Sequence, residues 1–142
     1  MLEKRVLTHW LNNGVEVVEP PSADLVVRSL EAAGLRVGRD YIDFLATVGG
    51  MVDHEWRLDQ WAVWRLERVI AENVDRTAGD VFFADWCLSS HFHFLRQETA
   101  ATSSVWVEGY ESRGPRRVAE SLTDFFERYL DRDQRIGVYF DD

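Results

Sequence analysis

The spacing of apolar side chains, together with residues that begin and end helices, predicts five helical segments. They are Leu2–Leu11, Ala23–Ala33, Asp40–Val48, Leu66–Asn73 and Leu122–Leu130. In most of them apolar residues recur at intervals of three and four, as on the buried face of an amphipathic helix. Ser22 suits an N-cap, and Gly34 and Gly49-Gly50 suit the ends of the second and third helices.

The segment between residues 81 and 110 has the alternating pattern of β-strands. The predicted strands are Val81–Trp86, His91–Arg96 and Val105–Tyr110. In the first, strict alternation places Val81, Phe83 and Asp85 on one face. Both faces of this strand are largely apolar, which predicts an internal strand covered on both sides. The short connections favour antiparallel hairpins.

The remaining segments carry weaker signals. We expect a loop with one or two strands over residues 51–64, a polar loop over Glu111–Arg117, a turn at Val118–Glu120 and a terminal strand over Arg135–Phe140. The whole pattern predicts a single α+β domain over residues 1–142. Its sheet should be mainly antiparallel, with helices packed at one side and at the ends.

The composition predicts a packed domain with more aromatic side chains than its core requires. Apolar residues make up 46% and aromatic residues 13% of the 142 positions, and six of these are Trp and eight are Phe. Such a chain can form a core and is not expected to be disordered. The net charge of −9 argues against binding nucleic acid through its phosphates and favours basic partners.

Cysteine usage and hydropathy restrict the compartment. Cys87 is the single cysteine, which excludes an intrachain disulfide. No apolar run approaches the roughly 18 residues of a membrane span. The first residues also lack the apolar run and cleavage site of a signal peptide. We therefore expect a cytoplasmic protein.

The order of these motifs resembles that of the SUKH superfamily, which contains a yeast cell-wall assembly regulator and many bacterial toxin-immunity proteins. The resemblance covers about residues 22–130. The matching residues are Leu30-Glu31, Asp40–Leu45 followed by Gly49-Gly50, Phe82–Trp86, His91–Leu95, Ser104–Val107 and Val118–Phe126. The chain departs from the family at Val37-Gly38-Arg39, where members often carry Leu-Pro before the aspartate and tyrosine.

The resemblance implies a non-enzymatic bacterial protein that binds a cognate toxin, often a nuclease, and neutralises it by occluding its active surface. A nuclease needs a basic surface to hold nucleic acid. An acidic inhibitor can occupy that surface through electrostatically steered association. The family also implies an alternative, an intracellular regulatory or scaffold module of the same fold. A monomer and a homodimer are both compatible with the sequence.

Two groups of residues have the types needed for chemistry, and each has a simpler structural interpretation. His91 and His93 share one strand face at a spacing common among metal ligands. Two ligands do not complete a site, so histidines packed on the sheet are the simpler interpretation. Cys87 could form a nucleophile–base pair with either histidine. It lacks an orienting residue, and a semi-buried cysteine at a strand end is the ordinary interpretation.

The acids and tryptophans between residues 53 and 64 suit either a carbohydrate-cleaving cleft or a protein interface. Paired carboxylates near aromatic rings are typical of glycosidases, but no second carboxylate motif accompanies them. Trp anchors ringed by acids suit a basic protein partner. The predicted partner-binding residues are Asp53, Glu55, Trp56, Asp59, Trp61, Asp85, Trp86, His91, Glu108 and Glu111. We expect no catalytic residue, cofactor or metal.

Overall fold

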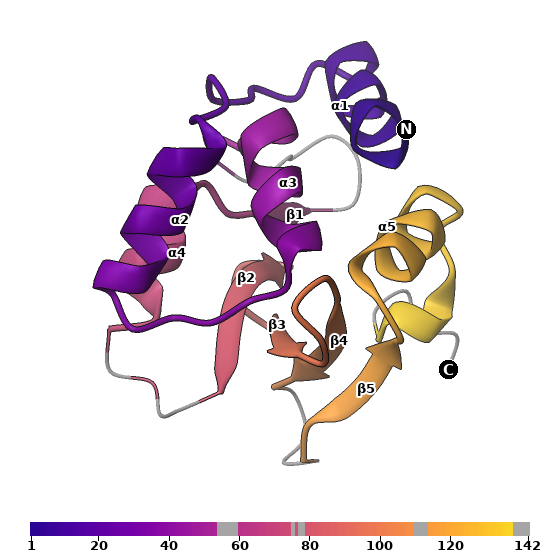
Figure 1. The fold of residues 1–142 in the computed structure, drawn as a ribbon. Coiled ribbons are helices and arrows are strands. Elements are labelled where there is room, and N and C mark those ends of the chain that lie inside the picture. The colour runs from indigo at the N-terminus through magenta and orange to yellow at the C-terminus, as the bar shows by residue number, and fades with distance from the viewer. Residues whose placement is uncertain (54–59, 75, 77–78, 110–113, 138–142) are drawn as a thin grey trace.

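The computed structural model describes residues 1–53, 60–74, 76, 79–109 and 114–137, which form an α+β domain (Figure 1). The helices are α1 (Leu2–Asn12), α2 (Ala23–Ala32), α3 (Arg39–Val48), α4 (Leu66–Glu72), α5 (Leu122–Leu130) and the short 3₁₀ helix η1 (Gln134–Ile136). The strands are β1 (Trp61–Val63), β2 (Asp80–Trp86), β3 (His91–Gln97), β4 (Ser103–Glu108) and β5 (Arg116–Ala119). They form one antiparallel sheet in the order β1-β2-β3-β4-β5, which confirms the predicted fold class.

Local signals set the helix ends as predicted. The Ser22 hydroxyl accepts a hydrogen bond from the backbone N–H of Leu25 at 3.1 Å and caps α2. Gly49 ends α3 with a left-handed φ of 81°. Gly50 has a second role, because a Cβ atom there would lie 2.7 Å from the backbone nitrogen of Arg65. The double glycine therefore stops α3 and lets the chain pass closely over the start of α4.

The N-terminus of α3 is attached to the turn between β3 and β4. A Cβ atom on Gly38 would lie 2.5 Å from the carbonyl carbon of Thr102, so only glycine fits this approach. The Gly38 N–H donates to the Ser103 hydroxyl at 2.8 Å, and Asp40 accepts from the Ser103 N–H at 3.0 Å. Burial raises the pKa of Asp40.

A bulge in β2 changes which residues face the helices. Phe82 pairs with Phe94 on β3 and Ala84 pairs with His93, so Phe83 is the extra residue. Phe83 and Ala84 both lie on the face covered by helices. Asp85 is thereby turned to the opposite face, and the predicted alternation, which put it beside Phe83, is wrong beyond the bulge. The prediction of a buried internal strand is confirmed.

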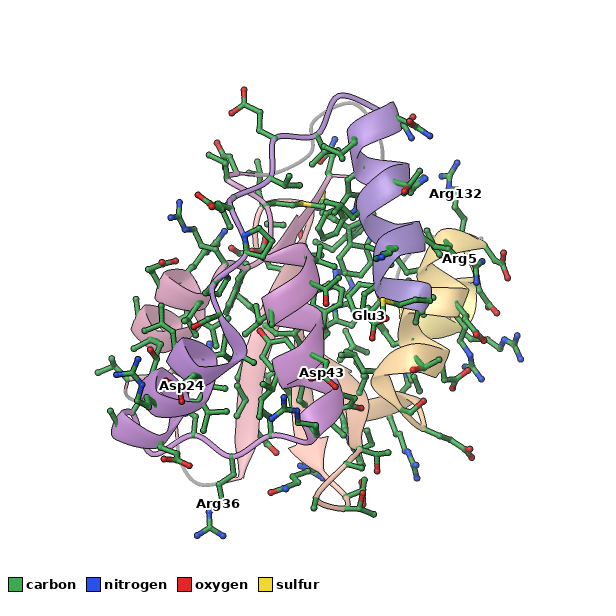
Figure 2. The ribbon with its side chains drawn as sticks, turned by 45° about the horizontal axis from the view of Figure 1, so that its top comes forward. Glu3, Arg5, Asp24, Arg36, Asp43 and Arg132 are labelled. Atoms are coloured by element: carbon green, nitrogen blue, oxygen red, sulfur yellow. The ribbon has the colours of Figure 1, made fainter. Side chains whose placement is uncertain are left out.

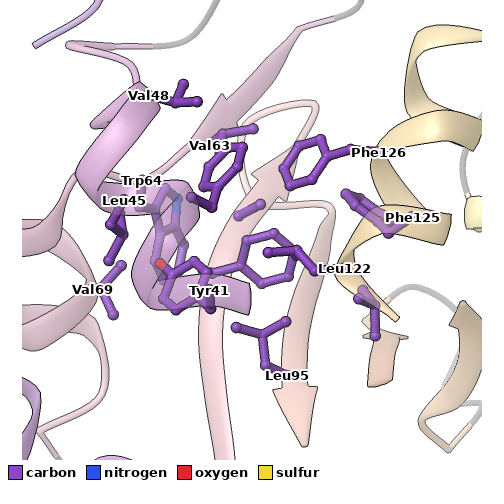
Figure 3. Close-up of a cluster of buried hydrophobic side chains, with 14 of the residues drawn as sticks. Tyr41, Leu45, Val48, Val63, Trp64, Val69, Leu95, Leu122, Phe125 and Phe126 are labelled. Carbon is purple, nitrogen blue, oxygen red and sulfur yellow. The ribbon is translucent and has the colours of Figure 1, made fainter. Parts of the chain in front are cut away.

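Aromatic residues join the helices to one face of the sheet (Figure 3). Phe44 of α3 stacks on Phe126 of α5 with ring centroids 4.4 Å apart. Phe83 of β2 contacts Phe125 of α5 edge to face at 5.6 Å. The Trp10 indole N–H of α1 donates to the Tyr129 hydroxyl at 2.7 Å. The N-terminal and C-terminal helices are therefore locked together inside one core.

Three arginines lie over aromatic rings on the opposite face of the sheet. The guanidinium carbon of Arg68 lies 4.7 Å from the centroid of the Trp64 ring. The same distance is 3.6 Å between Arg76 and Phe82 and 4.2 Å between Arg96 and Trp106. Each arginine also pairs with a carboxylate of the sheet, namely Asp85, Glu108 and Asp80 in the same order. Cation–π contacts and ion pairs thus cover aromatic surface that would otherwise face water.

Three expectations for the weaker segments require comment. Arg116–Ala119 is strand β5, so the predicted loop at Arg116-Arg117 and the predicted turn at Val118-Ala119 are wrong. This strand forms through backbone pairing with β4, and its side chains show no apolar alternation. The predicted terminal strand is wrong for Arg135-Ile136, which belong to η1, because the Asp133 side chain accepts the Arg135 N–H and turns the chain. Residues 138–140 of that prediction lie outside the described residues.

Candidate partner-binding site

Five of the predicted partner-binding residues lie at one end of the sheet. Trp61, Trp86 and His91 stand in one cross-strand row over β1, β2 and β3. Asp85 and Glu108 each pair with Phe92 in the next row. We call this end, with Gln60, Cys87–Ser90 and Gly109 as its connections, the turn end of the sheet. Of the other predictions, Glu55, Trp56, Asp59 and Glu111 lie outside the described residues.

Burial corrects the expectation that all of these side chains are exposed. The exposed fraction is 0% for Trp61, 0% for Asp85 and 4% for His91. Trp61 packs against Phe125 and Tyr129 of α5, which explains its burial. These three side chains therefore lie inside the protein in this conformation and support the turn end from beneath.

Trp86 and Glu108 are half-buried at the turn end, and Asp53 is exposed elsewhere. Asp53 follows Met51, which bridges Val17 on one side and Trp64 on the other. Because the bridge to Trp64 is parallel, Asp53 lies away from Gln60, at the far end of β1. The structure thus separates Asp53 from the other described predictions.

Asp85 is the central polar group beneath the turn end. Its carboxylate accepts from the Trp64 indole N–H at 2.7 Å and from the Arg68 guanidinium at 3.0 Å. It also accepts from the backbone N–H of Ser89 at 3.1 Å. A buried charge is tolerated when it is paired and hydrogen-bonded in this way. The network ties the turn between β2 and β3 to α4.

The turn between β2 and β3 holds an unusual backbone. Cys87, Leu88 and Ser89 have φ values of 52°, 54° and 68°, and Gln60 beside them has 61°. The Cys87 N–H donates to the Gln60 carbonyl at 3.0 Å. Among the described residues five non-glycine positions have positive φ, and four of them gather here. Each costs roughly 1–2 kcal/mol relative to ordinary backbone.

The strained turn presents an apolar side chain to solvent. Leu88 is 60% exposed at its tip, and Trp86 is half-buried at its base. The chain after β4 passes close to this turn, because a Cβ atom on Gly109 would lie 2.7 Å from the Ser90 carbonyl oxygen. Sequence reasoning missed Leu88 and Gln60. No glycine or asparagine marks these left-handed positions in the sequence.

A second acidic segment was also missed. The Val52 N–H donates to the Glu16 carbonyl at 3.0 Å, so residues 15–19 run beside residues 50–53. Glu16 and Glu19 are exposed there, next to the segment that carries Asp53. The alternation of Val15, Glu16 and Val17 was the available signal. Glu16, Glu19 and Asp53 therefore form an acidic surface beyond the outer edge of β1.

The two histidines of β3 share a face as predicted, but their rings serve packing. The ring nitrogen Nε2 of His93 lies 2.7 Å from the Ile136 carbonyl oxygen, and burial lowers the pKa of His93 to about 4. Burial, and then the charge of Arg116, lower the pKa of His91. No group of three His, Cys, Asp or Glu side chains is placed to hold a metal ion among the residues that the structure describes.

Comparisons with protein-family models, with curated proteins and with solved structures found no match to this chain. Within the described part of the chain, none of the helices has the length and apolar character needed to cross a membrane.

Proposed function

We propose that this protein binds and neutralises a cognate protein toxin, without enzymatic activity of its own, and that the turn end of the sheet contacts the toxin. The concentration of left-handed, non-glycine residues at this end carries the proposal. Such backbone persists only where its surroundings hold it, and it gathers at binding and catalytic sites. Here the buried Asp85 network holds the turn in place.

The side chains at the turn end suit an interface better than a reaction. Leu88 offers an exposed apolar anchor, with the half-buried Trp86 beside it and the partly exposed carboxylate of Glu108 at its rim. Apolar and aromatic anchors surrounded by polar residues are typical of binding hot spots. The polar groups Asp85 and His91, which could serve chemistry, are buried in the support of this surface.

The charge of the protein supports a basic partner. A net charge of −9 accelerates association with a positively charged surface and disfavours acidic competitors. A nuclease-type toxin has such a surface, because it must hold a phosphate backbone. The resemblance to the SUKH superfamily supports the same class of function.

The test is to co-express the product of the adjacent gene with this protein in a naive host and to isolate any complex. We expect rescue by the wild type and loss of rescue in Leu88→Asp, since aspartate tolerates left-handed backbone but removes the apolar anchor. Val74→Asp is the matched control, because Val74 is a 73% exposed apolar residue in a different connection.

Equal rescue by both variants would show that the turn end is not the contact surface. Absence of toxicity, or toxicity without rescue by the wild type, would contradict neutralisation. That result would favour the alternative of a regulatory or scaffold module, and a search for its binding partner would follow.

A further inference from the structure

The last strand of the sheet borders a groove rich in arginine. The groove has a volume of about 590 Å³ and is lined by Arg116, Arg117, Val118, Ala119, Glu120, Arg128 and Arg135. The lining residues come from β5 and the residue after it, from α5 and from η1, and these three elements contact one another (β5 and α5 are labelled in Figure 1). Four arginines meet in this groove although the chain as a whole carries a net charge of −9.

Two of these arginines are free to meet an external anion. Arg128 pairs with Asp124 at 3.1 Å and Arg135 pairs with Asp133. Arg116 and Arg117 are exposed, and no carboxylate of the described residues forms an ion pair with either. Their positive charge is therefore the uncompensated charge of the groove.

Part of the backbone of β5 is also available, although the Val118 carbonyl already accepts from the Arg128 side chain. β5 pairs with β4 on one side, and no backbone hydrogen bond joins its other edge to any described residue. Arg128 donates to the Val118 carbonyl at 2.9 Å, so its guanidinium stands directly beside β5. An exposed strand edge of this kind can pair with an incoming strand.

The two free arginines flank the edge from opposite faces. In the register with β4, Arg116 pairs with Val107 and Arg117 pairs with Trp106. Neighbouring residues of a strand point to opposite faces. An added strand would therefore bring two consecutive side chains to the two guanidinium groups, one on each face.

We propose that this groove binds an extended acidic segment of a partner protein, which adds to β5 as a further strand and places adjacent carboxylates on Arg116 and Arg117. Arginine binds carboxylates through paired, charge-assisted hydrogen bonds. A second copy of this chain is the wrong occupant, because pairing β5 with itself would bring arginines together and like charges oppose such pairing. The proposal is independent of toxin binding at the turn end.

The probe is a fluorescein-labelled peptide, Thr-Val-Thr-Glu-Glu-Val-Thr-Val, titrated with the full chain and followed by anisotropy. We expect saturable binding that weakens with added salt. The double variant Arg116→Glu/Arg117→Glu should lose at least about tenfold in affinity, because charge-assisted hydrogen bonds are lost. The same peptide with Lys-Lys in place of Glu-Glu should not bind.

Arg36→Glu is the control, because it reverses the charge of one exposed arginine, as each substitution of the double variant does. Arg36 lies in the connection between α2 and α3 and extends away from α5 (Figure 2). It should bind the peptide as the wild type does, and thermal melts should show that all variants fold. Backbone amide shifts in an NMR titration should centre on β5.

Three results would overturn the proposal. The first is absence of saturable binding to the wild type. The second is equal loss in Arg36→Glu, which would indicate a general effect of net charge. The third is full competition by inorganic phosphate with no amide shifts in β5, which would show a simple anion site without strand addition.

Discussion

Asn73 and Phe82 exchange two hydrogen bonds in place of a missing stretch of β-sheet. The Asn73 amide donates to the Phe82 carbonyl at 2.9 Å, and its oxygen accepts from the Phe82 N–H, also at 2.9 Å. β1 pairs with residues 84–86 of β2, and no other strand of the described residues borders the first part of β2 on that side. The buried amide of Asn73 satisfies this edge and joins α4 to the sheet.

Removing this amide should destabilise the fold. Asn73→Ala leaves the N–H and the carbonyl of Phe82 buried without partners, and we expect the free energy of unfolding to fall by about 2–4 kcal/mol. Asn13→Ala is the control, because Asn13 donates to the His9 carbonyl at 2.7 Å in an exposed position and should matter by less than about 0.5 kcal/mol. Urea denaturation measures both. Equal losses in both variants would show that the Asn73–Phe82 hydrogen bonds stabilise the fold no more than an exposed hydrogen bond does.

The sequence predicted those elements whose signals are local. Ser22 and the double glycine Gly49-Gly50 mark helix ends by their own chemistry, and the structure confirms them. The role of Asn73 could not be predicted, because its partner Phe82 is brought to it by the fold. The bulge at Phe83 likewise depends on how β2 and β3 pair. β5 was missed because it is held by backbone pairing with β4, and its side chains lack the apolar alternation that marks a strand in the sequence.

The candidate site was predicted in part. Their aromatic and acidic character put Trp86 and Glu108 among the predicted partner-binding residues, and the register places both at the turn end of the sheet. Burial could not be read from residue type, so Trp61 and Asp85 were expected on the surface and lie inside. Leu88 was missed because left-handed backbone at a leucine has no signal in one sequence.

The buried carboxylate of Asp85 should contribute more to the free energy of unfolding than an exposed ion pair does. Asp85→Asn removes the charge that pairs with Arg68 and leaves one acceptor atom for three donors. Because the Arg68 side chain is one-third exposed, we expect a loss of about 1–3 kcal/mol, below that of a fully buried pair. Asp80→Asn, which breaks the more exposed pair with Arg96, should cost at most about 1 kcal/mol. Guanidinium denaturation compares the two.

Hydrogen exchange adds a readout specific to the turn. The Ser89 amide donates to Asp85, so its protection should fall in Asp85→Asn and stay unchanged in Asp80→Asn. Unchanged protection in both variants would contradict the role of Asp85 in holding the turn.

Backbone strain at Leu88 should invert the usual order of glycine and alanine. Both Leu88→Gly and Leu88→Ala remove the exposed side chain, but only glycine accepts a φ of 54° without strain. We expect the glycine variant to be more stable than the alanine variant by roughly 1 kcal/mol. At Thr123, an exposed position of α5, glycine should instead be less stable than alanine by about 1 kcal/mol. Thermal melts of the four variants measure both orders of stability. If alanine were also more stable than glycine at Leu88, as expected at Thr123, the turn would not be strained.

Protonation of His93 should make the fold sensitive to mild acid. The ring lies 4.9 Å from the Trp61 ring and 5.4 Å from the Phe125 ring, and burial lowers its pKa from an ordinary value of 6.5 to about 4. Between pH 6.5 and about 4, the unfolded chain therefore binds a proton at His93 and the folded chain does not. Stability from this residue is complete above pH 6.5 and is lost as the pH falls toward 4. Over that interval the loss is on the order of 3 kcal/mol.

His93→Gln separates this effect from that of other groups. Glutamine can still donate to the Ile136 carbonyl, but it does not titrate. Urea denaturation of both proteins at several pH values between 7 and 4.5 should show the wild type losing stability faster, so that the advantage of histidine shrinks as the pH falls. Burial also lowers the pKa of His91, which remains in the variant and contributes equally to both curves. Parallel curves would therefore exclude His93 as the titrating group and assign the acid sensitivity elsewhere.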